Sequence, residues 1–402
     1  MRSENGGLEV TILSGVRVLD LSRVMSGPYC TAMLGDLGAE VIKLETPGSG
    51  DDSRRFGPFV NGASVYFALL NRGKKSVALN LKNPKARDLA LKLAAHSDVV
   101  VENFRPGVAA RLGLDYPTLS ASNPRLVYLS ISGFGQKGPF ADRPAYDLIV
   151  QAMSGLMSIT GQPDGPPTAV GESLADVATG MFGAFAVASA LFQRERSGAG
   201  THIDVAMFDS LLAMQSTALS RLFAAGAAPA RVGNRHPVTV PVDTFRAKDG
   251  LFAMVVPSDA HFRRLCELIG RPELASDARF KDNAARARNE PELKAFIEKW
   301  TAILSIDECV ATLGKADIPA GPVWDLQQAA RSEHALARRL LNRVAHPVIG
   351  ELELVSQPAR FSPQGEAAPS REPLLGEHTA EVLRGLGVDE QELEALRREG
   401  AI

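Results

Sequence analysis

Cysteine is scarce in this chain, and its first strand–helix turn lacks the glycine fingerprint of nicotinamide-binding folds. Its 402 residues include only three cysteines, Cys30, Cys266 and Cys309, and no two of them form a CxxC pair. This pattern argues against a structural zinc site or a disulfide framework, and it is typical of a reducing compartment. The first strand–helix turn reads SRVMSGPYC and is not a G-x-G-x-x-G fingerprint, so the nicotinamide signature is missing there, and the chain has no Walker A lysine motif.

A large charge of one sign and a long hydrophobic run are also lacking. Lys and Arg number 44 against 46 Asp and Glu, which leaves a net charge of -2 and argues against a general nucleic-acid or membrane-surface binder. The N-terminal MRSENGGLEV has no apolar core of the signal-peptide type. The longest apolar run, Met181–Phe192, is expected to be too short to span a bilayer. These features predict a cytoplasmic enzyme without nucleic-acid or membrane partners.

The first third of the chain alternates β-rich runs with helical patterns, which predicts an α/β fold. A chain of 402 residues exceeds the usual size of a single core, so two domains are expected. Strand–helix–strand alternation predicts a Rossmann-like, largely parallel sheet with right-handed crossovers. The predicted strands are 16–21, 40–45, 76–81, 98–101 and 126–131, and the predicted helices between them are 29–37 and 84–96.

Composition shifts suggest where the domains begin and end. Residues 1–219 are predicted to form the N-terminal part of a large α/β domain, and the Ala-, Gly- and Pro-rich segment 220–242 reads as a connector. Residues 243–330 are predicted to form a smaller α+β domain. Its hairpin turns at Asp249–Gly250, and its helices cover 261–269, 291–300 and 306–313. Residues 331–402 form a second linker and a tail, which is helical again over 373–387.

One carboxylate, Asp176, stands at the start of a long apolar helix. Ser173 is a natural N-cap, and Asp176 follows three residues later in the S-x-x-D capping pattern. An acid in the first turn of a helix usually accepts hydrogen bonds from the free N–H groups and interacts favourably with the helix dipole. Read alone, this segment therefore predicts a capping role for Asp176.

The segments around Asp176 change that interpretation. AYDLIVQAMSGLMSITG, GPPTAVGESLADVATGM and SGAGTHIDVAMFDSLLAM follow one another at 145–161, 165–181 and 197–214. Together they resemble the family III CoA-transferases of the formyl-CoA and crotonobetainyl-CoA transferase type. The resemblance covers 19–383 and implies that Asp176 is a catalytic nucleophile. It also implies a C-terminal return to the large domain, an interlocked homodimer, and CoA thioesters as substrates without a permanently bound cofactor.

Such a nucleophile would act by a covalent relay. A carboxylate can attack a thioester to form a mixed anhydride, which the CoA thiolate converts into an enzyme–CoA thioester that an acceptor acid then takes over. The carboxylate must be ionised, which a helix N-terminus favours, and each tetrahedral step needs N–H donors nearby.

Further candidate residues follow from the same resemblance and from their places beside predicted strands. The turn formed by Val24, Met25 and Ser26 comes directly before Gly27, and a glycine there would let a ligand approach the backbone closely. Cationic and polar side chains near the ends of parallel strands can meet the phosphates of CoA. The candidate CoA contacts are Val24, Met25, Ser26, Asn71, Arg72, Lys74, Lys75, Asn103, Phe104, Arg105, Arg111, Tyr146 and Asp147, with His236 as a weaker candidate for a substrate carboxylate.

Two alternatives to a transferase remain open. The related 2-methylacyl-CoA racemases carry a G-H-D sequence where this chain has Ala145, Tyr146 and Asp147, so the histidine base of racemisation is missing here. The other alternative is a protein that binds CoA without catalysis. The resemblance favours succinyl-CoA as donor and a dicarboxylate such as itaconate, glutarate or malate as acceptor. Two positions depart from the family pattern. Thr46 stands where formyl-CoA transferases carry a CoA-binding arginine, for which Arg54 or Arg55 could substitute. The loop Val255–Phe262 lacks the glycines that many relatives have there.

Overall fold

The computed structural model describes residues 11–362 and 369–402 and divides into two compact units, which are treated separately here. Unit 1 gathers three stretches of chain and unit 2 gathers two. Unit 1 comprises Met1–Leu156, Ala169–Ser216 and Glu333–Ile402, and unit 2 comprises Met157–Thr168 and Thr217–Ser332.

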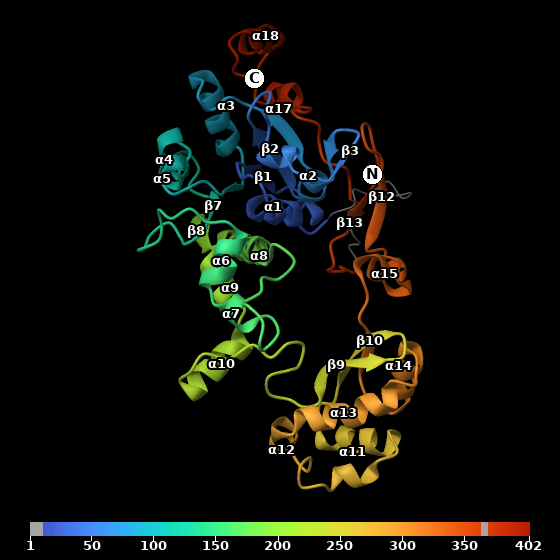
Figure 1. Cartoon of the computed structure of the whole chain (residues 1–402). Coiled ribbons are helices and arrows are strands. Elements are labelled where there is room, and N and C mark those ends of the chain that lie inside the picture. The colour runs from blue at the N-terminus through green and yellow to red at the C-terminus, as the bar shows by residue number, and fades with distance from the viewer. Residues whose placement is uncertain (1–10, 363–368) are drawn as a thin grey trace. The chain divides into compact units, whose positions relative to one another are not determined.

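A six-stranded parallel sheet forms the centre of unit 1 within the described residues (Figure 1). Its order is β5-β2-β1-β6-β7-β8, and every neighbouring pair is parallel, which confirms the predicted parallel sheet. The second strand matches its prediction at both ends, the other four predicted strands shift by one to three residues, and β8 was not among the predicted strands. The strands are β1 (Arg17–Asp20), β2 (Glu40–Glu45), β5 (Lys75–Ala78), β6 (Val99–Glu102), β7 (Val127–Ser132) and β8 (Thr201–Ala206).

Helices cover both faces of this sheet. On one face, α1 (Ser26–Asp36) and α8 (Leu174–Ser197) pack over Val18 and Val99. On the other face, α3 (Pro84–Ala95) and α5 (Tyr116–Ser122) pack over Leu19, together with α17 (Thr379–Gly385) and α18 (Glu390–Arg398) from the end of the chain (Figure 1). Neighbouring residues of β1 thus enter opposite cores, as alternation along a strand requires.

Shorter elements complete unit 1. Between β2 and β5 lie η1 (Asp52–Arg55), the strands β3 (Phe59–Val60) and β4 (Ala63–Ser64), and α2 (Val65–Asn71). A second hairpin near the C-terminus, which the sequence analysis did not identify, joins β12 (Leu341–His346) to β13 (Gly350–Val355). The remaining helices are α4 (Val108–Leu112), α6 (Asp147–Met153), α9 (Met207–Ala213) and α16 (Glu333–Ala337).

The first helix begins three residues earlier than predicted. The sequence predicts a loop over 22–28 and a helix from Tyr29, whereas α1 begins at Ser26. Pro28 suggested a loop, but proline is tolerated in the first turn of a helix because its missing N–H has no partner there. The N-terminus of α1 is therefore formed by Ser26 and Gly27, which changes what those residues can do.

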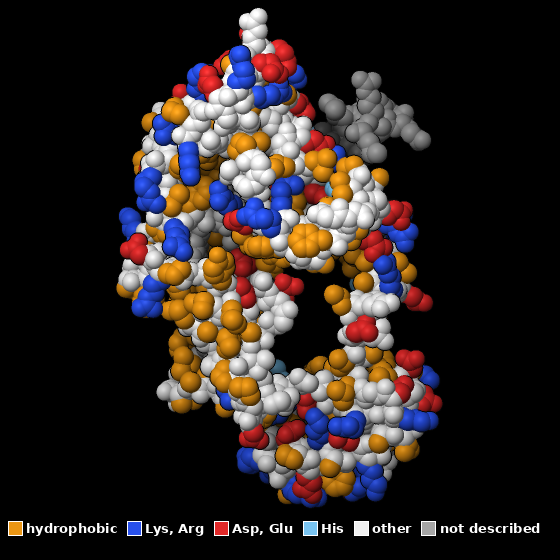
Figure 2. Space-filling model, turned by 45° about the horizontal axis from the view of Figure 1, so that its top comes forward, with side chains coloured by type: hydrophobic (Ala, Val, Ile, Leu, Met, Phe, Trp, Pro, Cys, Tyr) orange, Lys and Arg blue, Asp and Glu red, His pale blue; other side chains and the backbone are white. Residues whose placement is uncertain are grey.

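The helix α8 is long and apolar enough to cross a membrane by length and composition alone. It has 24 residues, its most apolar window has a mean hydropathy of 1.6, and half of that window is buried inside the chain. This corrects the expectation that the apolar run is too short. Outside the core it exposes Met181 (52%), Phe185 (73%) and Phe192 (62%). Figure 2 shows hydrophobic side chains gathered over the part of unit 1 that carries α6, α8 and α9.

Unit 2 is built on a small antiparallel sheet backed by helices. Strand β9 (Val242–Ala247) pairs with β10 (Gly250–Val255), which pairs with β11 (Ala320–Pro322). The β9–β10 hairpin confirms the predicted hairpin, but its turn is formed by Lys248 and Asp249, one residue earlier than predicted. Its core includes Phe245, Phe252 and Phe262. The helices are α11 (Asp259–Leu268), η2 (Pro272–Ala275), α12 (Asn283–Arg288), α13 (Glu290–Thr301), α14 (Ile306–Lys315) and α15 (Leu326–Ala330).

The contact-based units differ from the domain boundaries predicted from composition. Residues 157–168 belong to unit 2, although they interrupt unit 1 in sequence. The predicted connector 220–242 begins within α10 (Ser216–Ala225), so its first residues are helical. A short helix, α7 (Leu156–Ile159), spans the other crossing between the units. The predicted boundaries remain predictions.

Candidate active site

A pocket opens at the carboxyl ends of β1, β6 and β7 in unit 1, where open parallel sheets place their ligands. Its volume is about 240 Å³. The loops after all three strands contribute to the wall, as do the segment before α6 and the first turn of α8. The residues that line it are Arg23, Val24, Met25, Ser26, Asp52, Asn103, Phe104, Arg105, Pro106, Ile131, Ser132, Gly133, Ala141, Arg143, Pro144, Ala145, Tyr146, Asp176 and Met207.

Asp176 lies in this wall, at the third residue of α8 and against the N-terminus of α1. The side chain and the backbone N–H of Ser26, the first residue of α1, hydrogen-bond to its carboxylate. The carboxylate therefore faces the positive ends of two helices, its own and α1. Burial and the charge of Asp147 raise the pKa of Asp176 to about 6, against the lowering effect of the Ser26 hydrogen bonds. At neutral pH the group is mostly ionised but more basic than an ordinary aspartate.

Two glycines in α8 allow this contact between the helices. A Cβ on Gly180 would lie 2.8 Å from the carbonyl oxygen of Ser26, and one on Gly183 would lie 3.2 Å from the sulfur of Cys30. Larger side chains at these positions would push α8 away from α1. Glycines one and two turns beyond Asp176 thus let α8 approach α1 closely enough to bring Asp176 to Ser26.

Ser173 stands at the N-cap position of α8, as predicted, but within the described part of the chain it does not cap the helix with its side chain. Instead, Asp147 Oδ1 accepts the N–H of Ala175 at 2.7 Å, so a residue of α6 caps α8 from outside. Gln151 fixes that carboxylate by donating to Asp147 Oδ2 at 2.7 Å, and it accepts the N–H of Val170 at 2.9 Å. Asp147, predicted as a CoA contact, therefore acts on the nucleophile's helix, and it is not among the residues that line the pocket.

The structure brings seven of the predicted CoA contacts together in the pocket. Asn103 ties two of the loops, because its side-chain amide accepts the N–H of Arg23 at 2.8 Å and donates to the Arg23 carbonyl at 2.8 Å. Tyr146 is 74% exposed, so it is not a core tyrosine. The seven that line the pocket are Val24, Met25, Ser26, Asn103, Phe104, Arg105 and Tyr146.

Four other predicted CoA contacts are placed elsewhere. Asn71, Arg72, Lys74 and Lys75 precede or begin β5, so they enter the sheet from its amino end, whereas ligands collect at the carboxyl end. Asn71 and Lys74 are buried, and Lys74 donates to Asp20 at 3.0 Å and to Asn71 at 2.9 Å. Arg72 pairs with Asp36, and Lys75 bridges Glu40 and Glu381. All four have partners within the chain and none lines the pocket, so their assignment to CoA remains a prediction that the pocket does not support.

Further predicted contacts lie outside the pocket wall. Arg111 is exposed on α4, away from the lining residues. Arg54, considered as a substitute phosphate ligand, forms two 2.7 Å hydrogen bonds to Glu45. Gly27 serves packing within the chain, because a Cβ there would lie 2.2 Å from the Cβ of Ser22.

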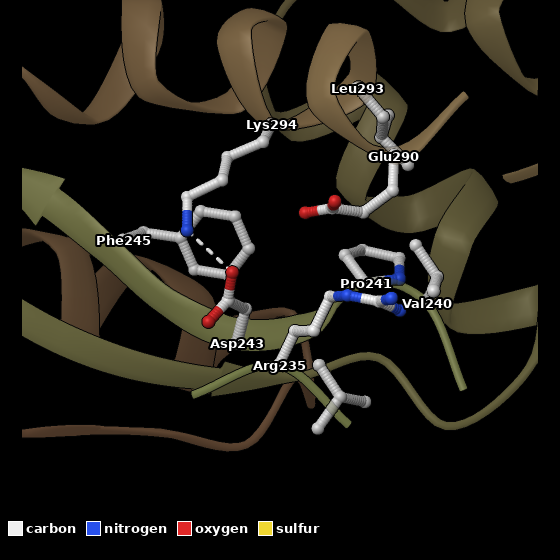
Figure 3. A pocket seen from close by; sticks show the side chains of 9 residues that line it. Arg235, Val240, Pro241, Asp243, Phe245, Glu290, Leu293 and Lys294 are labelled. Atoms are coloured by element: carbon white, nitrogen blue, oxygen red, sulfur yellow. Dashed lines mark hydrogen bonds and ion pairs between the residues drawn. The ribbon is translucent and has the colours of Figure 1, made fainter. Parts of the chain in front are cut away.

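His236 belongs to unit 2 and stabilises a turn. Its Nδ1 accepts the N–H of Val238 at 3.3 Å and of Thr239 at 3.0 Å, so the imidazole is occupied by backbone. A small pocket nearby is lined by Arg235 but not by His236, and there Lys294 pairs with Asp243 (Figure 3). Its volume of about 10 Å³ corresponds to roughly one water molecule, so it holds no substrate-sized ligand.

Sequence reasoning missed several residues near Asp176. Tyr66 in α2 has a pKa raised to about 12, by burial and then by the charges of Asp176 and Glu172. Arg23 and Arg143 also line the pocket. Arg23 stands directly before the identified turn and could have been found there. Tyr66 and Arg143 sit outside any strand end, and only the fold brings them to the site.

This chain is similar in sequence to known CoA-transferases. The sequence model of CoA-transferase family III matches residues 13–379. Acetyl-CoA:oxalate CoA-transferase from Acetobacter aceti is 50% identical over 328 residues, covering 81% of this chain and 84% of that protein. Succinyl-CoA:glutarate CoA-transferase from Mus musculus is 38% identical over 394 residues, covering 97% and 90%. Succinyl-CoA:mesaconate CoA-transferase from Haloarcula marismortui is 38% identical over 387 residues, covering 94% and 97%.

Solved structures agree in fold. A CAIB/BAIF family protein from Brucella suis has a TM-score of 0.83 at 38% identity, covering 94% of this chain and 99% of that chain. A hypothetical protein from Mycobacterium tuberculosis has a TM-score of 0.82 at 34% identity, covering 92% and 99%. The likeness therefore extends over nearly the whole length of both proteins.

Proposed function

The chain belongs to CoA-transferase family III, and from that premise we propose that Asp176 carries CoA from an acyl-CoA donor to a free dicarboxylic acid. The observation that carries the proposal is the position of Asp176. It lies in the wall of the pocket, is ionised at neutral pH, and receives hydrogen bonds from Ser26. A carboxylate with these properties is a suitable nucleophile for a thioester.

The proposed reaction has four steps. The Asp176 carboxylate attacks the donor thioester and expels the CoA thiolate, which leaves a mixed anhydride. The thiolate attacks the Asp176 carbonyl and releases the donor acid, which leaves an aspartyl-CoA thioester. The acceptor carboxylate attacks that thioester, expels the thiolate again and forms a second anhydride, which the thiolate cleaves to acyl-CoA. No net proton, water molecule or ATP is consumed, and Asp176 returns to its starting state.

Ser26 is suited to stabilise charge in these steps. When the thiolate or the acceptor attacks the Asp176 carbonyl, that oxygen becomes an oxyanion. The oxygen already has the Ser26 N–H and hydroxyl as hydrogen-bond partners at the N-terminus of α1. Donors fixed before the reaction stabilise such an oxyanion without reorganisation.

Three arginines give the pocket a positive wall. Arg23, Arg105 and Arg143 all line it, and among the described residues none of the three has an ion-pair partner. Their guanidinium groups suit the phosphates of CoA and the second carboxylate of a dicarboxylic acid. We assign them these ligands as part of the proposal.

We propose succinyl-CoA as donor, with a dicarboxylate such as glutarate, itaconate or malate as acceptor. The succinyl-CoA transferases among the relatives, including those for glutarate and mesaconate, support this pair. A second candidate pair is acetyl-CoA and oxalate, favoured by the relative at 50% identity. Pocket shape decides between them.

We further propose a homodimer, supported by the apolar surface of unit 1. The exposed residues of α8, with Leu148 (56%) and Ile149 (46%) of α6, form a surface that a second copy would cover. We also propose a cytoplasmic location, which agrees with three buried cysteines that form no disulfide among the described residues.

Purified protein tests the proposed function directly. Acetyl-CoA and succinyl-CoA are incubated with oxalate, glutarate, itaconate, malate and mesaconate, and the thioesters are separated by chromatography. We expect transfer with at least one dicarboxylate. Trapping with hydroxylamine followed by peptide mass spectrometry should place the adduct on Asp176. Asp176→Ala should lose transfer by at least about 10³-fold while keeping its fold and CoA binding.

Other outcomes point to the alternatives. Incorporation of deuterium at the α-carbon of a 2-methylacyl-CoA in heavy water, without transfer, would support the racemase. CoA binding without a trappable adduct would support a non-catalytic protein. Substantial transfer by Asp176→Ala would contradict the nucleophile assignment.

A further inference from the structure

The turn between β1 and α1 holds a β-branched residue in an unfavourable backbone conformation. Val24 has φ +65°, in the left-handed region that L-residues avoid, and β-branched residues most of all. Val24 lies two residues before Ser26, whose N–H and hydroxyl face Asp176. Such a conformation persists only where the surroundings impose it.

Asp51 provides the contact that imposes it. Its carboxylate accepts the N–H of Val24 with both oxygens, at 3.2 and 3.3 Å. Asp51 is 2% exposed and is itself fixed, because it pairs with Lys43 Nζ at 2.8 Å and accepts the N–H and hydroxyl of Ser53 at 2.8 and 2.7 Å. Burial raises the pKa of Asp51, but the charge of Lys43 and these hydrogen bonds outweigh burial and hold it well below its ordinary value.

The same buried pair reaches the turn at a second point. Lys43 Nζ donates to the carbonyl of Ser22 at 2.8 Å, while Asn103 holds both backbone groups of Arg23. The turn is thus held at three consecutive residues. Only the bond from Asp51 acts on the residue with the unfavourable φ.

We propose that Asp51 is a positioning residue, which holds Val24 in its left-handed conformation and so fixes the N-terminus of α1 against the nucleophile Asp176. The inference rests on the proposed function of Asp176 and deepens it. Among the described residues, Asp51 is not one of those that line the pocket, and it is not one of the groups that shift the pKa of Asp176. It acts through the backbone of Val24 and the hydrogen bonds of Ser26.

The test compares Asp51→Asn, Val24→Gly and the double variant with the wild type. Glycine adopts a positive φ without cost, so it removes the strain that Asp51 opposes. We expect Asp51→Asn to lower kcat by about 5- to 30-fold, the factor that corresponds to the left-handed penalty of one residue. In the Val24→Gly background, the same change should lower kcat by no more than about 2-fold.

The pH dependence of kcat/KM distinguishes a positioning role of Asp51 from a direct effect of its negative charge on Asp176. The groups that act on Asp176 are Ser26 from α1 and Asp147 from α6, and Tyr66 from α2 lies near both Asp176 and Glu172. The charged residues Arg23, Asp52, Arg105 and Arg143 share the pocket. Losing the Ser26 hydrogen bonds raises the pKa of Asp176, so the acid limb of kcat/KM should move to higher pH in Asp51→Asn. Removing the negative charge of Asp51 would move the limb the opposite way. The double variant should restore the limb.

Asp36→Asn is the matched control. It also breaks an ion pair, the partly buried one with Arg72, but at the far end of α1. We expect lower thermal stability for this variant, with the acid limb of kcat/KM unchanged. An equal shift of the limb in Asp36→Asn would contradict the proposal.

Thermal melting of the four proteins gives a readout that needs no activity. The stability lost in Asp51→Asn should be smaller in the Val24→Gly background, whatever reaction the protein catalyses. If Asp51→Asn does not fold alone, the double variant is expected to fold. Equal losses of stability and kcat in both backgrounds, or an unfolded double variant, would overturn the proposal. Activity retained by Asp176→Ala would instead overturn the proposed function.

Discussion

At the scale of single residues, Asp176 combines burial with ionisation. Burial and the nearby charge of Asp147 raise its pKa to about 6, while Ser26 counteracts part of that rise. A carboxylate of this kind is more nucleophilic than an exposed one and remains mostly ionised at neutral pH. Its environment is therefore favourable for reaction and unfavourable for folding.

We expect Asp176→Asn to be more stable than the wild type at neutral pH. The folded-state pKa of about 6 lies above the ordinary value of 3.8, so ionisation opposes folding. The cost is absent below pH 3.8, grows as the pH rises, and is fully present above about pH 6, where it reaches at most about 3 kcal/mol. Asparagine removes the charge and keeps an acceptor for Ser26. Thermal melting at pH 7.5 and pH 4.5 should show a difference that shrinks at the lower pH, and a difference independent of pH would contradict this.

Asp147→Asn should shift the acid limb of the kcat/KM profile to lower pH, by about one unit. The charge of Asp147 raises the pKa of Asp176, and asparagine removes that charge while retaining an oxygen for the N–H of Ala175. Asp209→Asn is the control, since Asp209 is an exposed acid in the first turn of α9. Its profile should match the wild type. An unshifted limb in Asp147→Asn would mean that Asp147 acts only as a cap.

Sequence reasoning found the reactive residue but not its surroundings. Asp176 was identifiable because its flanking segments resemble a known family. The donors of Ser26, the cap from Asp147 and the burial of Lys74 were not, because each joins residues far apart in the chain. Lys74 shows the physical reason most clearly. A lysine beside a strand looks like a phosphate ligand until the partner that buries it, Asp20, is known.

At the scale of elements, the close packing of α1 and α8 sets the geometry of the site. Local patterns predicted five of the six strands of the central sheet, because strands buried on both faces of a parallel sheet read as short apolar runs. They failed at the start of α1 and the cap of α8, where side chains from other elements decide. Glycines at the contact between these helices bring Ser26 and Asp176 together.

Gly180→Ala is expected to lower both stability and transfer. Alanine normally stabilises a helix relative to glycine by about 1 kcal/mol, but here its Cβ would lie 2.8 Å from the Ser26 carbonyl. Separating α8 from α1 should cost about 1 to 3 kcal/mol and lower kcat about tenfold. Denaturant unfolding and transfer kinetics measure the two effects.

Gly314→Ala provides the comparison for that variant. Gly314 lies in α14, and a Cβ there would meet no atom within 4 Å among the described residues. It should be neutral or slightly stabilising. If Gly180→Ala behaved in the same way, the close contact of α1 and α8 would not be what positions the nucleophile.

At the scale of the whole molecule, the main feature is the exposed apolar surface around α8, which the proposed homodimer would cover. Phe185 is 73% exposed on α8, a helix that is long and apolar enough to cross a membrane by length and composition only. A second copy covering this face would account for the exposure without a membrane.

We expect Phe185→Glu to weaken the proposed homodimer. A charge in an apolar interface loses its hydration without gaining a partner. The mass measured by light scattering after size exclusion should shift toward that of the monomer. We expect the dissociation constant of the dimer to rise by at least about tenfold. Ile303→Glu, at a residue that is 74% exposed in unit 2, should leave the mass unchanged. A wild-type monomer, or partition into detergent, would contradict the dimer.

The return of the chain to unit 1 has a consequence for biosynthesis. Leu393, Leu396 and Ala401 complete the same core that Leu19 and Leu89 begin, and Asn80 donates its N–H to the carbonyl of Ala401 at 2.8 Å. A ribosome therefore releases the first strands long before the residues that seal their outer face, whereas most of unit 2 emerges as one uninterrupted stretch. The amino-terminal sheet therefore stays partly uncovered until residues 390–401 have emerged, and its outer core is completed only when that segment packs against it.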